Sequence, residues 1–432
     1  MFRPVSARLP DRLTHRRIPR QSTRVRLSTT QTLVLGAATA LGSLSIDLYL
    51  PAFPELAAEL GASEAAVQLT LTACVVGIAL GQLIAGPVSD AVGRRGPIAL
   101  GIGAWSLASF ACALAPSIAT FTLLRFAQGL AGAAGLVVAR AVVRDIASGP
   151  DLIKAFARLM LVVGVVPIAA PTVGGLLLER MTWRGLFVVL GVLGAVFTVV
   201  VLVWLRESLP PERRTDGGVR AALVSYRILL ADRSFMSAVF VVALAFSALF
   251  IYVSSSSFVL RQVFHLTPGQ FGLLFGVNSV GLVLGNQVSG LLVHRWSPNT
   301  LLTRAIGLGV LGSLALLVAG ATARGGVFAV AVPLCVVVFA VGAAMPVASG
   351  RVMDTHPDRA GAAAALQGLF QFTVGGVLAP LVGLFGATSV LPLAGLMAAS
   401  LVASLVLFLV SNRARGSVPV QAPVPVPAPV QT

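Results

Sequence analysis

The sequence predicts an all-α membrane protein with twelve transmembrane helices arranged as two bundles of six. Of its 432 residues, 57% are hydrophobic and 11% are charged, whereas about a quarter of the residues in soluble domains are charged. Apolar runs of the roughly 20 residues that a helix needs to cross a bilayer recur along the chain. Arginines gather in alternate loops between these runs, as they do in oriented membrane proteins. These three observations exclude an ordinary soluble fold.

Residues 1–30 contain eight arginines and one acid but no apolar periodicity. We expect a disordered cytoplasmic tail that acts as a topogenic signal or contacts anionic lipid headgroups, and we expect no nucleic-acid partner. A basic start followed by an apolar run resembles a secretory signal. That run is long, however, and contains Asp47, so we expect an uncleaved first span.

Six apolar runs are expected to form an N-terminal bundle over residues 31–205. They are 32–51, 64–88, 97–115, 118–143, 155–178 and 184–205. The polar segment 206–233, rich in arginine, acid and proline, is expected to be a cytoplasmic linker. Six further runs are expected to form a C-terminal bundle over residues 234–411. They are 234–260, 268–293, 300–320, 326–348, 360–386 and 390–411. Residues 412–432 alternate proline and valine, which favours an extended, disordered cytoplasmic tail.

The charges of the loops predict the orientation. Basic residues occupy alternate loops, at Arg94, Arg95, Arg144, Lys154, Arg158, Arg206 to Arg233, Arg295, Arg304, Arg351 and Arg359. The opposite loops are nearly free of them, with the exceptions Arg180, Arg184, Arg261 and Arg324. Because loops rich in arginine and lysine stay in the cytoplasm, both termini and the linker are predicted to lie inside.

A weak internal repeat supports the division into two halves. At an offset of 200 residues, four residues of the first half recur in the second, whereas Asp90 is replaced by Gly290. The recurring residues are Gly81, Val88, Ser89 and Arg95, which match Gly281, Val288, Ser289 and Arg295. This agrees with parallel halves related by an axis along the membrane normal, with a substrate site at their interface.

Two charged residues lie within apolar runs, where charge is expensive and functional by default. Asp47 lies near the outer end of the first run, and Arg125 lies at a comparable depth in the fourth. We hypothesise that Asp47 faces a central cavity and exchanges a proton, and that a nearby Arg125 guanidinium favours its charged form. The alternative is an interfacial Asp that caps a helix and an Arg that snorkels to the headgroups.

The segment GPVSDAVGRRGP, residues 86–97, interrupts two apolar runs with a polar turn at the membrane surface. Its glycines, Gly86 and Gly93, permit a tight reversal of the chain. We expect Asp90, Arg94 and Asp145 to lie at one level, with Arg95 beside them, and to form an acid–Arg–acid latch. The alternative is an ordinary loop with exposed charges, worth about 0–1 kcal/mol.

The fifth run contains Pro167, Pro171, Gly174 and Gly175. Proline removes a backbone donor and kinks a helix, whereas glycine permits close packing. The pattern predicts either a hinge for alternating access or a passive kink.

Scattered polar residues within the apolar runs are candidates for a largely apolar substrate cavity. They are Tyr49, Gln128, Tyr252, Asn278, Gln367 and Gln371. For any one of them, an interhelical hydrogen bond is the alternative.

Motifs of other function classes are missing from the sequence. Cys74, Cys112 and Cys335 lie in apolar runs without metal-like spacing, so we expect buried thiols, no disulfide and no metal site. There is no Walker phosphate loop, HExxH or GxSxG motif, which argues against ATP-driven pumping and against an enzyme.

Four segments together resemble the twelve-span drug:proton antiporters of the major facilitator superfamily, most of all the bicyclomycin and chloramphenicol resistance (Bcr/CflA) branch. They are SIDLYLPAFPEL, VQLTLTACVVGIALGQLIAGPVSDAVGRRGP, LLRFAQGLAGAAGLVVARAVVRD and PIAAPTVGG, and HPDRAGAAAALQGLFQF near the eleventh run is similar as well. The resemblance implies that Asp47 is the proton-coupling acid, Arg125 its partner, and Pro171-x-x-Gly174-Gly175 the antiporter motif. This chain departs from the family pattern at Ala170, where glycine is usual, and at Ala91, where a basic residue is frequent.

The resemblance implies an exporter of small, moderately apolar compounds that works by alternating access in the bacterial plasma membrane. It implies that the proton gradient supplies the energy without a cofactor, and that the protein works as a monomer with drug and protons as its partners in the lipid bilayer. An importer or uniporter of a small metabolite on the same fold is one alternative. A membrane scaffold or sensor without transport is another.

Overall fold

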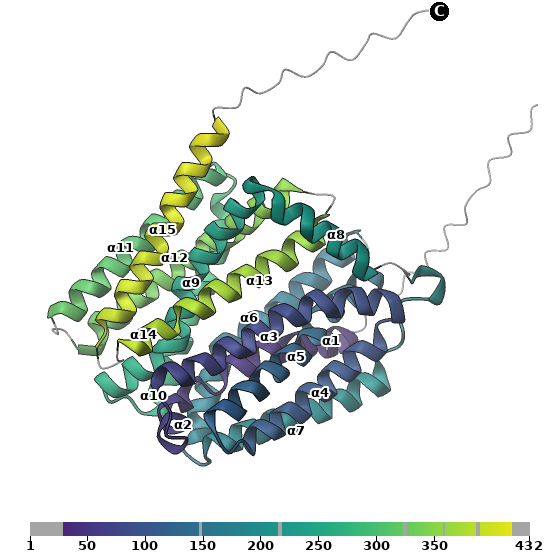
Figure 1. Cartoon of the computed structure of the whole chain (residues 1–432), viewed down its shortest axis with the longest axis horizontal. Coiled ribbons are helices and arrows are strands. Elements are labelled where there is room, and N and C mark those ends of the chain that lie inside the picture. The colour runs from purple at the N-terminus through teal and green to yellow at the C-terminus, as the bar shows by residue number, and fades with distance from the viewer. Residues whose placement is uncertain are drawn as a thin grey trace, which may run out of the picture.

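The computed structural model describes residues 29–146, 149–214, 218–322, 326–356, 359–385 and 389–416. Within these ranges the chain is helical and contains no strand. Nearly all of the two predicted tails lies outside the described residues. The two bundles lie side by side in Figure 1, where the colour runs from purple to blue-teal through the first and from teal to yellow through the second.

The first bundle is built from helices that follow the six predicted runs. They are α1 Thr29–Asp47, the 3-10 turn η1 Leu50–Ala52, α2 Phe53–Glu59, α3 Glu64–Val92, α4 Arg95–Ala113, α5 Ile118–Ile146, α6 Gly149–Leu178 and α7 Trp183–Trp204. The short helix α2 occupies a stretch that the sequence predicted as a loop.

The second bundle repeats this arrangement. It consists of α9 Arg233–Phe258, the π-helical turn η3 Val259–Val263, α10 Pro268–Leu292, α11 Pro298–Thr322, α12 Gly326–Thr355, α13 Ala360–Leu378, α14 Pro380–Leu384 and α15 Leu391–Gly416. Helix α15 runs five residues past the predicted boundary at 411.

The predicted linker is not an unstructured loop throughout. It contains the turn η2 Pro211–Arg213 and the helix α8 Gly218–Ala231, which lies at one end of the molecule in Figure 1. Leu229 of α8 is fully buried, whereas Leu223 is 60% exposed. The segment forms a helix because one face of it packs against the bundle ends, a tertiary contact that a polar composition does not reveal.

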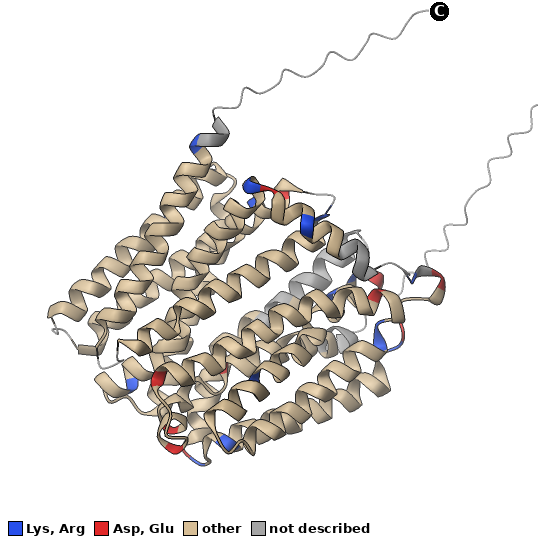
Figure 2. Ribbon diagram, viewed as in Figure 1, with Lys and Arg blue, Asp and Glu red and all other residues tan. Residues whose placement is uncertain are grey.

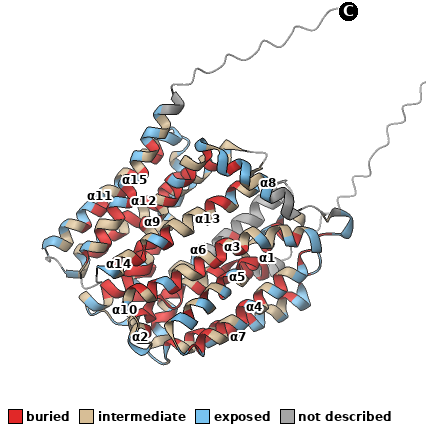
Figure 3. Ribbon diagram, viewed as in Figure 1, coloured by how far each residue is buried: buried red, intermediate tan, exposed pale blue. Residues whose placement is uncertain are grey.

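The membrane-spanning character follows from helix length and surface. Eleven helices among the described residues are long and apolar enough to cross a membrane, and α6 contributes the shorter apolar stretch Gly164–Leu178. Figure 3 shows exposed residues on the outer faces of the bundles, where large apolar side chains such as Leu100 and Leu107 are more than 70% exposed. Such a surface suits lipid rather than water. The predicted all-α fold with twelve spans is confirmed.

The internal repeat is present, but its register differs from the predicted one. Helices α3 and α10 begin at the equivalent N-cap residues Ser63 and Thr267, 204 positions apart. Gly77 and Gly81 of α3 pack against α5, and Gly281 and Gly285 pack against α12 in the same way. Gly81 therefore corresponds to Gly285, and the predicted match to Gly281 is wrong. A slip of four residues preserves the helix face, so small residues still match by chance.

The two ends of the bundles differ in charge. We call the end that carries Arg94, α8 and the C-terminus of α15 the basic end, and the other end, which carries α2, the opposite end. Most of the charged residues coloured in Figure 2 lie at these two ends. Two predicted exceptions to the charge bias, Arg184 and Arg261, form ion pairs with Glu59 and Glu55 of α2.

Candidate functional site

Asp47 is the last residue of α1 and is nearly buried, with 6% of its surface exposed. Its carboxylate has no hydrogen-bond or ion-pair partner among the described residues. Gly36, three helical turns earlier on the same face, packs against Val162 of α6. Asp47 therefore lies on the side of α1 that faces α6, the helix through which the first bundle contacts α10 of the second.

Arg125 of α5 is completely buried. Its guanidinium donates to the Ser45 carbonyl over 2.7 Å and to Oε1 of Gln128, and lies 4.4 Å from the centre of the Tyr49 ring. Its Nε atom has no partner. The alternative that Arg125 snorkels to the headgroups is wrong, because no part of the side chain reaches the surface.

Asp47 and Arg125 do not contact each other directly, although the sequence suggested that they pair. Arg125 contacts residues two positions before and two positions after Asp47, namely Ser45 and Tyr49. The guanidinium is directed to the Ser45 carbonyl, to Gln128 and to the Tyr49 ring, and none of these contacts includes the Asp47 carboxylate. Arg125 thus acts on the backbone that carries Asp47, and its role in tuning Asp47 stays a prediction.

A chain of buried hydrogen bonds holds Arg125 in place. Gln128 Nε2 donates to Ser109 Oγ over 2.6 Å, and Trp105 Nε1 donates to Ser45 Oγ over 2.6 Å. The Tyr49 hydroxyl lies 3.1 Å from that of Thr70. Tyr49 and Gln128, predicted to line the cavity, belong to this network in the present conformation. Sequence reasoning missed Ser45, Trp105, Ser109 and Thr70, whose only signal is a polar group within an apolar run.

The structure brings the predicted latch residues together at the basic end. Arg94 is 3% exposed and pairs with Asp145 through Nε over 2.8 Å and with Asp90 through NH1 over 2.6 Å. NH1 also donates to Ser89 Oγ over 2.7 Å. Burial opposes the charge of Arg94, but the hydrogen bonds to Asp145 and Asp90 outweigh it and raise the pKa of the guanidinium. The alternative of freely exposed loop charges does not describe Arg94.

Glu207, which the sequence analysis did not single out, completes this cluster. Its Oε1 accepts from the Arg94 amide over 2.8 Å and its Oε2 from the Arg95 amide over 3.1 Å. Amides at the N-terminus of a helix have no hydrogen-bond partner within that helix. The Glu207 carboxylate, which follows α7, accepts from these two and so caps α4. Burial works against its charge, but the backbone donors prevail and lower the pKa of Glu207. An acid two residues after the end of the sixth run was the available signal.

Of the remaining residues of the latch segment, Gly93 makes the turn, whereas Arg95 and Gly86 do not. Gly93 has φ of +104°, a conformation that favours glycine, and a Cβ atom there would lie 2.7 Å from Glu207 Oε2. The Arg95 side chain is exposed and donates to the Leu202 carbonyl rather than to an acid. The prediction that Gly86 permits the reversal is wrong, because α3 continues through it to Val92 and the chain turns only at Gly93; the Gly86 carbonyl accepts from Ser89 Oγ.

The predicted hinge segment forms one of the contacts between the two bundles. Helix α6 continues through Pro167 and Pro171 without a break. A Cβ atom at Gly174 would overlap the Leu48 carbonyl, and one at Gly175 would overlap the Pro268 carbonyl of the second bundle. The glycines are therefore points of close approach, and whether α6 also bends during transport stays a prediction.

The cavity candidates of the second bundle are buried or half-buried. Tyr252 accepts a hydrogen bond of 3.0 Å from Asn278 Nδ2 and stacks on Phe275 with 5.2 Å between ring centres. Gln367 donates to Ser349 over 2.8 Å, while its Oε1 is buried without a partner. Gln371 is half-buried.

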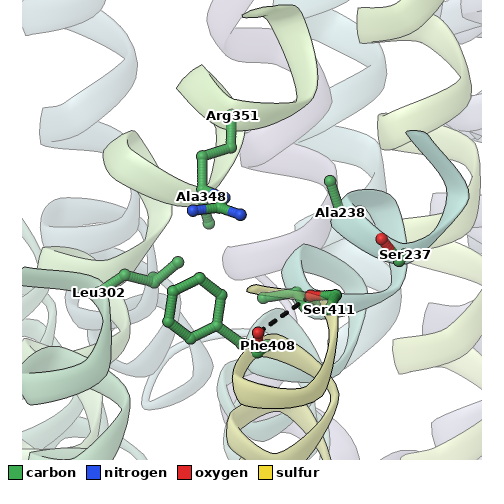
Figure 4. Close-up of a pocket in the computed structure, with 8 residues that line it drawn as sticks. Ser237, Ala238, Leu302, Ala348, Arg351, Phe408 and Ser411 are labelled. Atoms are coloured by element: carbon green, nitrogen blue, oxygen red, sulfur yellow. Dashed lines mark hydrogen bonds between the residues drawn. The ribbon is translucent and has the colours of Figure 1, made fainter. Parts of the chain in front are cut away.

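A small cavity lies between α9, α11, α12 and α15 at the basic end of the second bundle (Figure 4). It holds about 10 Å³, and Arg351 lies over the Phe408 ring at 4.9 Å. Ser411 donates to the Phe408 carbonyl over 3.0 Å. A space of this size does not admit a drug-sized molecule. Among the described residues there is also no group of His, Cys, Asp and Glu that could hold a metal ion.

Comparison with known proteins connects this geometry to a family. The profile of the Major Facilitator Superfamily matches residues 35–380. The chain belongs to the Major Facilitator Superfamily. The twelve spans and the two bundles joined by a linker are thus those of a superfamily of transporters.

Individual relatives within the superfamily cover most of the chain. The uncharacterized MFS-type transporter YdgK of Bacillus subtilis is 37% identical over 84% of this chain and 90% of its own length. The bicyclomycin resistance protein homolog of Haemophilus influenzae is 30% identical over 87% and 94%, which confirms the predicted resemblance. A bacterial homologue of the human lysosomal transporter Spinster, solved in an inward-facing and occupied conformation, superposes with a TM-score of 0.70 over 88% of this chain and 96% of that one at 16% identity. The last likeness concerns the fold alone.

Proposed function

We propose that the protein exports small, moderately apolar compounds of the chloramphenicol or bicyclomycin kind, driven by inward proton flow. One observation carries this proposal, namely the nearly buried and unpartnered carboxylate of Asp47 in a membrane-spanning segment. Burying an ionised carboxylate without a partner is costly, which favours the uptake of a proton there. Relatives named for bicyclomycin and multidrug resistance support the substrate class.

The contacts between the bundles support alternating access. At the opposite end, Gln68 of α3 bonds to Ser255 of α9 over 3.2 Å, and Thr172 of α6 bonds to the Gly272 carbonyl of α10 over 3.0 Å. Phe53 and Phe258 meet there with 5.7 Å between ring centres. This conformation is therefore closed at the opposite end, and substrate and protons would exchange at the basic end.

The orientation in the membrane follows from charge. We infer that the basic end faces the cytoplasm of a bacterium and that both termini lie there. The structure then represents the state closed to the outside, in which drug enters from the cytoplasm and Asp47 releases its proton to the same side. In the state open to the outside, Asp47 takes up a proton as the drug leaves.

The remaining proposals concern what the transporter requires. We propose that it works as a monomer in the lipid bilayer, that the proton gradient is its energy source, and that it needs no cofactor. It carries its substrate across the membrane unchanged, so we propose that it is not an enzyme.

Drug accumulation in a pump-deficient bacterial host tests the function. Expression is expected to lower the internal level of the exported compound, and a proton uncoupler is expected to restore it. Purified protein in vesicles with a pH gradient is expected to move protons outward from the vesicle only when drug moves in the other direction. Higher accumulation upon expression would instead show an importer, and uphill transport without proton movement would refute the role of Asp47.

A further inference from the structure

An ion pair at the opposite end joins the two bundles next to the proposed proton site. Arg261 of η3 belongs to the second bundle, and Glu55 of α2 belongs to the first. Arg261 NH1 lies 2.6 Å from Glu55 Oε2, and NH2 lies 2.6 Å from Oε1. Such a two-pronged pair between guanidinium and carboxylate is geometrically specific and stronger than a single contact.

Arg261 is more than a surface charge. Its side chain is 12% exposed, and NH1 also donates to the Pro51 carbonyl over 2.5 Å. This arginine therefore holds both a side chain and the backbone of the segment between α1 and α2. An exposed pair contributes little to stability, whereas a cation withdrawn from water this far depends on its partners.

The segment that Arg261 holds also carries Asp47. Arg125 binds the Ser45 carbonyl before Asp47, and Gly174 of α6 packs directly against the Leu48 carbonyl after it. Arg261 then binds Pro51 and Glu55, so the backbone on both sides of Asp47 is tied to neighbouring helices. Of these three ties, only that of Arg261 comes from the second bundle.

We propose that the Glu55–Arg261 pair couples the opening of the outer side to the exposure of Asp47, which makes both of them positioning residues for the proton step. The proposal rests on the proposed function. While the pair is closed, Asp47 stays buried on a backbone segment held from both bundles. When the bundles separate at this end, the pair must break, and η1 and α2 are released so that Asp47 meets external water.

The chain contains a matched control pair at the same end. Glu59, one helical turn after Glu55, pairs with Arg184 of α7 over 2.9 Å, and Arg184 also donates to the Ala113 carbonyl over 2.8 Å. The residue types and the side of the membrane are the same, but both partners belong to the first bundle. Loss of this pair removes a similar contact without releasing the two bundles from each other.

Labelling of an engineered cysteine tests the gate. Ser255→Cys places a thiol at the buried contact with Gln68, and a membrane-impermeant thiol reagent is added from outside to full-length protein in vesicles. Arg261→Ala and Glu55→Ala are expected to raise the labelling rate about tenfold, the order that follows from losing a hydrogen bond to a charged group. Arg184→Ala is expected to leave it nearly unchanged. Equal labelling of Arg261→Ala and Arg184→Ala would overturn the gate.

Proton flux without drug tests the coupling. Arg261→Ala is expected to let protons leak into vesicles in the absence of drug. The exchanged pair Glu55→Arg with Arg261→Glu is expected to reduce both the leak and the fast labelling without abolishing them, because a glutamate at position 261 cannot donate to the Pro51 carbonyl. Faster labelling without a leak would overturn the link to Asp47 while leaving the gate in place. A wild-type protein that labels as expected but never couples drug movement to proton movement would refute the proposed function instead.

Arg261→Lys keeps the charge but loses the two-pronged geometry. Its labelling rate and its proton leak are expected to lie between those of wild type and Arg261→Ala, and it tests the same contact if Arg261→Ala does not fold.

Discussion

Helices α3 and α10 begin at equivalent N-caps and pack through equivalent glycine pairs, but they end in different surroundings. The last turns of α3 carry Asp90, and Arg94 follows the helix. Arg94 pairs with Asp90 and Asp145, and its amide donates to Glu207. Helix α10 leads into His294, Arg295 and Trp296, and the Trp296 ring lies 4.2 Å from the Arg304 guanidinium carbon. Two halves of one fold thus keep the same backbone packing and differ in their ionic contacts.

The difference continues inside the bundles. The glycine contacts of α5 and α12 are 209 positions apart, which places Leu334 where the first bundle has Arg125 and Asp354 where it has Asp145. Tyr252 and Asn278, two buried polar residues of the second bundle, are uncharged at neutral pH. We infer that the first bundle carries the proton and latch chemistry, while the second supplies the surface against which it moves and, through Arg261, a tie to the segment that follows Asp47.

The largest effect in a test of this division is expected at Asp47. Asp47→Asn removes the proposed proton carrier, and proton-coupled export is expected to fall by about 100-fold or more, as when a proton-transfer group is lost. Drug-induced proton flux in vesicles measures it. Asp354→Asn changes an acid of the second bundle in the same way and is expected to retain transport. Coupled export that survives in Asp47→Asn would show that another group carries the proton.

The second effect concerns stability. Arg125→Leu leaves the Ser45 carbonyl and Gln128 without their donor, and each buried orphan group costs about 1–3 kcal/mol. We expect a clearly lower unfolding temperature of the purified protein. The matched change in the second bundle, Leu334→Met, conserves volume at a buried position and is expected to cost less than about 1.5 kcal/mol. If both variants lowered the unfolding temperature equally, the hydrogen bonds of Arg125 to the Ser45 carbonyl and Gln128 would not be important for stability.

The third effect separates switching from binding. Arg94→Ala breaks the contacts to Asp90 and Asp145 and is expected to lower the transport rate about tenfold, the order of a lost charge-assisted hydrogen bond. The substrate affinity is expected to stay the same, because the cluster lies at the basic end away from Asp47. Arg295→Ala, in the corresponding loop of the second bundle, is the control. A loss of affinity at an unchanged maximal rate would argue against a latch.

The smallest effect is a dependence on pH through Glu207. Its pKa is lowered from the ordinary value of 4.5, so its contribution to stability is fully present above that value and is lost as the pH falls through the lowered pKa. We expect Glu207→Gln to be less stable than wild type by about 0.5–1.5 kcal/mol at pH 7, with the gap narrowing below pH 4.5. Thermal unfolding of both proteins at several pH values measures this difference in stability. A difference that does not change with pH would show that the charge of Glu207 does not contribute to it.

Local sequence features were sufficient to predict the membrane spans and the end of the bundles at which most arginines lie. Hydrophobic run length predicted the helices because the bilayer thickness sets it, and the spacing within residues 86–97 predicted that Arg94 meets Asp90. The helix α8 was missed, because it is stabilised by packing against the bundle ends rather than by its own composition. Glu207 was missed because its role depends on the end of α7 meeting the start of α4.

The sequence by itself determined a fold of twelve membrane spans with an acid and an arginine inside the apolar runs of its first half, since hydropathy and charge placement are local properties. Only the tertiary structure decided the register of the repeat, the separation of Asp47 from Arg125, and the pairing of Glu55 with Arg261. The last two residues are 206 positions apart, and no local signal brings them together. Such contacts depend on the phase of each helix and on which helices become neighbours, and these are settled when the bundles pack.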